Sequence, residues 1–138
     1  MKAKRWFVLF SMLACAMMLL PVKAADDVKK TEEHGTVIFY RTRNAKGAAI
    51  GLNITGGADG KVGVLKNGSK IVKELPAGQF TFTVSAPSVA GQDSLIINVE
   101  AGKTYYVKGE TKWGWPAARA RFTMMDEKKG KAESNKIK

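Results

Sequence analysis

Residues 74–84 read ELPAGQFTFTV and combine a turn with an alternating run of apolar residues and threonines. Pro76 fixes its own φ at about −65°, and Gly78 can adopt the positive φ that many tight turns use. Beyond the turn, apolar side chains alternate with threonines at Phe80, Phe82 and Val84. This two-residue period predicts a β-strand with one face in a core and the other in water.

The same signals recur on both sides of this stretch. Runs of β-branched, aromatic or alternating apolar residues predict further strands near residues 36–40, 50–54, 62–64, 69–75, 95–100, 104–108 and 118–124. Turn residues separate the strands at spacings of roughly 8–12 residues. We therefore expect an all-β chain, a small antiparallel β-sandwich of about seven to eight strands, in which no amphipathic helix is needed to cover a sheet.

Two turns also predict which strands pair. Asn67-Gly68 is the strongest short hairpin signal, because a type I′ turn needs positive φ at both positions. It predicts a hairpin with residues 69–75 as the returning strand. Residues 101–103 (AGK) predict a tight connection that makes 104–108 the partner of 95–100. We expect the core to contain Phe80, Phe82, Tyr105 and Val107.

The N-terminus predicts export. Three basic residues precede a run of 15 mostly apolar residues, Trp6 to Leu20, and small residues lead to Ala24. A membrane-spanning helix needs roughly 20 apolar residues, so a cleaved signal peptide is favoured. The expected organisation is a helical signal peptide at 1–24, a linker at 25–34, the sandwich at 35–125 and a charged tail at 126–138. The tail is either a short helix or disordered.

Cys15 is the only cysteine and lies inside the apolar run. Lipidation of Cys15 would make the protein a membrane-anchored lipoprotein. However, residues 16–20 would then place apolar side chains where a polar tether is expected, so a small hydrophobe in the signal peptide is the favoured interpretation. Cleavage after Ala24 would leave no cysteine, and hence no disulfide or thiol nucleophile.

The charge balance favours anionic partners. The formal net charge is +11, and removal of residues 1–24 takes away four basic residues and no acids, which leaves +7. Such a surface attracts phospholipid headgroups or acidic polymers. Nucleic acid is not expected as a partner, because the predicted signal peptide directs the chain to the periplasm or the cell envelope.

Two segments resemble known envelope domains. Residues 74–84 are similar to the leucine-proline-glycine signature of PEGA-type β-sandwich domains. Residues 101–107 (AGKTYYV) look like the second signature of a family of small bacterial envelope proteins and lipoproteins with a domain of unknown function. The resemblance covers roughly residue 35 to the C-terminus. It implies a β-sandwich in the envelope, and it implies no reaction.

No residue pattern predicts catalysis. His34, the only histidine, lies at the edge of the linker, where a solvated residue is expected rather than a catalytic base. The acidic residues show no spacing typical of a carboxylate pair or a calcium loop. We therefore expect no enzyme activity, no cofactor and no metal site.

One cluster predicts binding. A loop with two tryptophans lies among basic residues, and the candidate site consists of Lys108, Lys112, Trp113, Trp115, Arg119 and Arg121. Tryptophans beside cations could form an amphipathic rim for a sugar or a membrane surface. The alternative is that both tryptophans fold back and cap the end of the sandwich.

Three functions remain open on the sequence alone. The first is a non-enzymatic envelope module that binds an anionic surface or a protein partner through this cluster. The second is an accessory subunit of an envelope assembly, joined by β-strand addition at an open sheet edge. The third is an enzyme that acts on polysaccharide through a carboxylate site.

Overall fold

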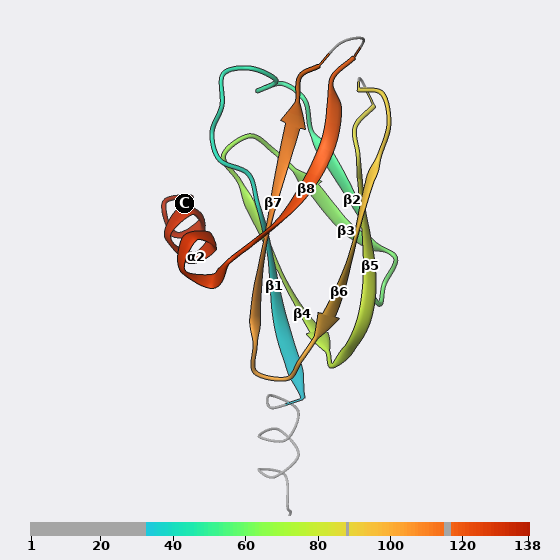
Figure 1. The fold of residues 1–138 in the computed structure, drawn as a ribbon, viewed down its shortest axis with the longest axis vertical. Coiled ribbons are helices and arrows are strands. Elements are labelled where there is room, and N and C mark those ends of the chain that lie inside the picture. Colours follow the sequence, from blue (N-terminus) through green and yellow to red (C-terminus); the bar gives the residue numbers. More distant parts are fainter. Residues whose placement is uncertain (1–32, 88, 115–116) are drawn as a thin grey trace, which may run out of the picture.

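The computed structural model describes residues 33–87, 89–114 and 117–138. Two four-stranded sheets pack face to face, and one short helix lies outside them (Figure 1). The elements are β1 (His34–Tyr40), β2 (Leu52–Gly56), β3 (Lys61–Leu65), β4 (Lys70–Pro76), β5 (Gly78–Ser85), β6 (Asp93–Val99), β7 (Thr104–Lys112), β8 (Arg119–Met125) and α2 (Glu127–Asn135). The prediction of an all-β sandwich is confirmed. The predicted signal peptide with Cys15 lies outside the described residues.

The chain crosses repeatedly between the two sheets. Sheet A has the order β4-β1-β7-β8, and sheet B has the order β3-β2-β5-β6. All pairings in these sheets are antiparallel except that of β1 with β7, which is parallel. The parallel pair arises because the chain returns from sheet B to a place beside β1 while running in the same direction as β1.

Both pairing predictions drawn from turns are wrong. Gly68 has the positive φ of +68° that the turn requires, and Ser69 N–H donates to the Lys66 carbonyl at 3.2 Å. Yet β3 pairs with β2, while β4 pairs with β1 in the other sheet. Likewise β7 pairs with β1 and β8 rather than with β6. A tight turn fixes a local reversal, but it does not fix which strand supplies the hydrogen bonds that follow.

The core forms where the inward residues of both sheets meet. Phe82 on β5 and Val107 on β7 are fully buried, whereas Phe80 and Tyr105 are only partly buried at its margin. Phe39 on β1 joins the two sheets, with its ring centroid 5.0 Å from that of Phe82 in an edge-to-face arrangement. Such a geometry is favourable for aromatic pairs. One interior strand of each sheet, β1 in sheet A and β5 in sheet B, therefore contributes a ring to this contact.

Helix α2 covers sheet A on the side away from sheet B (Figure 1), which the sequence analysis did not require. Asp126 caps its N-terminus by accepting a hydrogen bond from Lys129 N–H at 2.9 Å. The buried residues of the helix are small, Gly130 and Ser134. Beneath and beside it, a second core cluster contains Tyr40, Tyr106 and Ile137. The helix therefore packs through small residues and not through an apolar stripe, and Ile137 beyond its end adds an apolar contact.

No helix in the part of the chain that the structure describes is both long enough and apolar enough to cross a membrane.

Replacement of Gly130 by alanine tests the packing of α2. A methyl group at this position would overlap the Tyr106 side chain. We expect Gly130→Ala to weaken the packing of α2 by about 1–3 kcal/mol, seen as faster hydrogen exchange of the α2 amides. Alanine intrinsically favours a helix by about 1 kcal/mol over glycine, so slower exchange would contradict the contact. Lys128→Ala, at an exposed site of the same helix, is the control and should not accelerate exchange.

Candidate functional site

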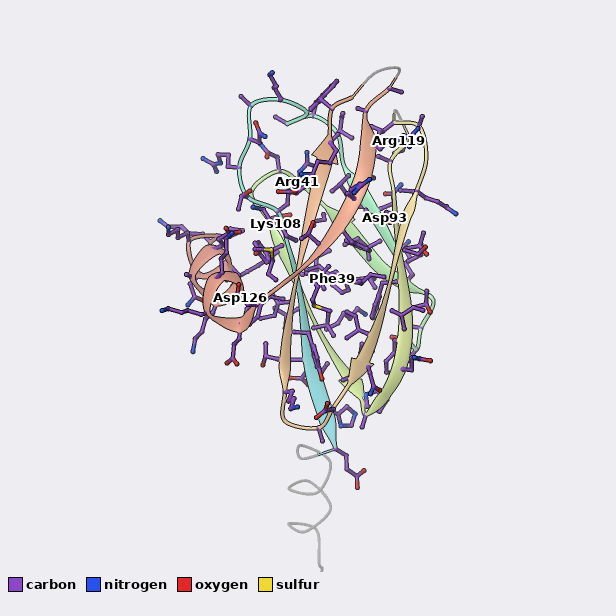
Figure 2. All side chains as sticks on the ribbon, in the orientation of Figure 1. Phe39, Arg41, Asp93, Lys108, Arg119 and Asp126 are labelled. Carbon is purple, nitrogen blue, oxygen red and sulfur yellow. The ribbon has the colours of Figure 1, made fainter. Side chains whose placement is uncertain are left out.

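The β7–β8 hairpin brings four of the predicted site residues to one face. Its register places Lys112 opposite Arg119, Glu110 opposite Arg121 and Lys108 opposite Thr123. These side chains alternate with buried Val107, Ala120 and Phe122, so they lie on the outer face of sheet A. Figure 2 shows Arg119 near the end of the hairpin and Lys108 lower, toward α2.

Lys108 belongs to an ion-pair network beneath α2. Its Nζ lies 3.2 Å from Glu133 Oε2 and 3.3 Å from Glu110 Oε1. Tyr40, which is fully buried, donates its hydroxyl to Glu133 Oε2 at 3.0 Å. The network therefore fastens the helix to β1 and β7.

The network shifts three pKa values. Burial and the bond to Glu133 raise the pKa of Tyr40. Burial alone would lower the pKa of Lys108, but Glu133 and Glu110 outweigh this and raise it. Burial alone would raise the pKa of Glu133, but the Tyr40 hydroxyl and Lys108 outweigh this and lower it. Lys108 and Glu133 are therefore held in their charged forms.

The other cations stand at the end of the hairpin. Arg119 and Arg121 are exposed, and no carboxylate of the described residues lies within 4.0 Å of either. Lys112 is exposed and lies 3.6 Å from Glu110. Trp113 follows it with 59% of its surface exposed. We call Lys112, Trp113, Arg119 and Arg121 the basic tip. Trp115 lies outside the described residues, so its predicted role stays a prediction.

A buried arginine supports the loop beside the basic tip, and the sequence analysis missed it. Arg41 is 3% exposed, and its guanidinium donates to the carbonyls of Ile50 and Gly47, the latter at 2.8 Å. Burial lowers its pKa. The two-residue alternation of β1 could have indicated that Arg41 is buried. Val37 and Phe39 point inward, and Arg41 is the next residue on the same side of the strand. The arginine thus ties the loop at 42–51 to the end of the core.

A shallow polar cleft lies between this loop and β7. Its volume is about 200 Å³, and it is lined by Arg41, Thr42, Asn44, Lys46, Gly109, Glu110, Thr111 and Lys112. Among these lining residues the only carboxylate is that of Glu110, which two lysines share. In the described part of the chain no group of three potential ligands could hold a metal ion. His34 is the first residue of β1.

The outer face of sheet B differs in composition from that of sheet A. Ten of its outward side chains are uncharged: Asn53, Thr55, Val64, Gln79, Thr81, Thr83, Ser85, Ser94, Ile96 and Asn98. We call these ten residues the neutral face. A single lysine, Lys61, borders it beside Thr55.

Comparison of the chain with protein-family models, curated proteins and solved structures finds no match. The resemblance to envelope domains of unknown function therefore stays a prediction.

Acid should release α2 from the sheet. The folded pKa of Glu133 is lowered, so its contribution is complete above its ordinary pKa of about 4.3 and is lost as the pH falls through the folded value. The raised pKa of Lys108 preserves its contribution up to about pH 10 and loses it above. We expect the NMR signals of the Gly130 amide to report undocking below about pH 4.

Two variants on the same helix identify the group responsible. Glu133→Gln should remove this acid transition and leave α2 more loosely packed at neutral pH. Glu127→Gln, at an exposed first-turn position, should leave the transition unchanged. An unchanged acid midpoint in Glu133→Gln would show that another carboxylate controls the helix.

Proposed function

We propose that this protein is a non-enzymatic module of the bacterial cell envelope that binds an anionic surface through its basic tip. In this proposal residues 1–24 direct export, and the sandwich is a rigid support for the hairpin that carries the tip. The ligand is a surface with many phosphates or carboxylates, such as a phospholipid leaflet or an acidic polymer.

The observation that carries the proposal is the pair of exposed, unpaired arginines beside an exposed tryptophan. Arg119 and Arg121 have no carboxylate within 4.0 Å in the described part of the chain, so neither has to break an ion pair before it contacts a ligand. Trp113 adds a ring that suits the boundary between water and lipid. Each basic residue near an anionic membrane contributes about 1 kcal/mol.

The cleft beside the tip favours binding over catalysis. Its carboxylate, Glu110, lies 3.3 Å from Lys108 and 3.6 Å from Lys112. This carboxylate therefore already takes part in two ion pairs. Within the described residues this leaves the cleft without the pair of carboxylates that hydrolysis of a polysaccharide would use.

Removal of the two arginines should weaken binding to anionic vesicles. The test uses protein recovered from the envelope fraction of the cells that make it, and vesicles of phosphatidylglycerol and phosphatidylcholine. We expect Arg119→Gln/Arg121→Gln to reduce the partition coefficient about 30-fold at low salt, since two contributions of about 1 kcal/mol are lost. Salt should reduce binding of the unchanged protein, because it screens charge.

A matched double variant separates the effect of the basic tip on binding from the effect of the overall net charge. Lys61 and Lys128 are exposed and, in the described part, have no carboxylate within 4.0 Å, but they lie elsewhere on the molecule. Lys61→Gln/Lys128→Gln removes the same charge and should retain most of the binding. Equal losses in both variants, or no binding of the unchanged protein at low salt, would reject the proposal.

One observation favours a second candidate, the accessory subunit joined by strand addition. β6 is an edge strand that pairs only with β5 among the described strands, and its residues 94–99 are uncharged. Uncharged edges invite pairing with another chain. The first residue of β6, Asp93, is engaged, because its carboxylate accepts a hydrogen bond from Phe122 N–H on β8 at 3.0 Å.

Hydrogen exchange tests this second candidate. The protein is purified from its native envelope together with any bound partner, and exchange is compared before and after the partner is removed. Strand addition should slow exchange over β6 in the complex, because a new strand would occupy its free backbone groups. Equal exchange over β6 in both samples would exclude strand addition at this edge.

A further inference from the structure

Charge is divided unequally between the two sheets. The strands of sheet A contain eight lysine, arginine, aspartate and glutamate residues. The strands of sheet B contain two, Lys61 and Asp93. The Asp93 carboxylate is engaged with the Phe122 N–H at the side of the sandwich. The outward positions of sheet B are thus uncharged apart from the bordering lysine.

The neutral face combines hydroxyl groups with aliphatic surface. Thr83 lies near the middle of central strand β5, and its Oγ1 is 3.0 Å from Ser94 Oγ. Ile96 and Val64 are 61% and 48% exposed on the same face. The paired hydroxyls of Thr83 and Ser94, and the aliphatic groups of Ile96 and Val64, reduce the cost of removing water from this part of the face.

The composition of the face selects the kind of partner. An anionic surface or a nucleic acid would find no arginine or lysine among its ten residues. A sugar ring would find no aromatic side chain to stack on. A second uncharged face of the same kind fits best, and the chain carries one on every copy.

The charge of the rest of the molecule points to the same partner. Residues 33–138 contain 17 lysines and arginines against nine acids, so two copies repel each other wherever their basic surfaces meet. The neutral face lies on the opposite side of the sandwich from α2 (Figure 1) and from the outward arginines of β8. Apart from Lys61 at its border, this face lets two copies meet without bringing like charges together.

We propose that the protein forms a reversible two-fold dimer in which the neutral faces of two copies pack against each other. A two-fold interface uses the same patch on both subunits, as this arrangement does. Four strands about 4.8 Å apart, with five to eight residues at about 3.3 Å each, give a patch of roughly 400 Å² in projection per copy. Interfaces of this size belong to the weak, transient class, so we expect association only at high protein concentration.

A matched pair of lysine substitutions tests the dimer. The protein as purified from the producing cells is followed by sedimentation velocity from about 10 µM to 1 mM, a range in which weak association is partial. The unchanged protein should shift from monomer to dimer. Thr83→Lys places a charge at the centre of the neutral face and should weaken association at least tenfold. Thr104→Lys makes the same substitution at an exposed position of sheet A and should leave association unchanged.

A second variant and the response to salt also test the dimer. Ile96→Lys, at a highly exposed position of the same face, replaces Thr83→Lys if that variant does not fold. Salt should preserve or strengthen the dimer, because it screens repulsion between copies, whereas salt weakens binding of the basic tip to vesicles. A monomer at all concentrations, or equal association in the Thr83 and Thr104 variants, would overturn the dimer without bearing on the basic tip.

Discussion

The contact between Phe39 and Phe82 holds the two sheets in register. Each ring comes from a strand in the interior of its sheet, and the centroids are 5.0 Å apart. Phe122 adds a second ring beside Phe39 at 5.8 Å. Once these rings are buried, alternation sends the neighbouring side chains outward, where the two sheets present different chemistry. The same two-residue alternation that places apolar side chains in the core therefore determines which side chains lie on the outer faces.

The strands could be predicted because each carries its own signal, but their neighbours could not. Threonine alternation places Phe82 and Val84 inward whichever strand lies beside them. The turn at Asn67-Gly68 has the expected positive φ, yet it leads from one sheet to the other. Pairing depends on how apolar faces meet across the whole sandwich, and that information is not contained in any single segment.

The part of the candidate site that lies on a single hairpin could be predicted from the sequence. Lys112 and Arg119 flank a single connection, so their proximity follows from the sequence. The contribution of α2 does not follow, because its contact uses Gly130 and Ser134 and lacks an apolar stripe. Only the fold shows that Glu133 reaches Lys108 and removes it from the free cations of the hairpin.

The basic tip and the neutral face constrain each other through symmetry. A two-fold axis within the interface either runs along the strands, which places both tips at the same end, or runs across them, which places the tips at opposite ends. Like charges interact over about 8–10 Å at physiological salt. Packed sheets lie about 10 Å apart, so the tips, on the outer sheets of the two copies, are at least about 30 Å apart in either arrangement. Repulsion between the tips therefore does not choose between the two arrangements. The arrangement with opposite ends would present one basic tip to each of two facing surfaces, which a monomer with a single tip cannot do.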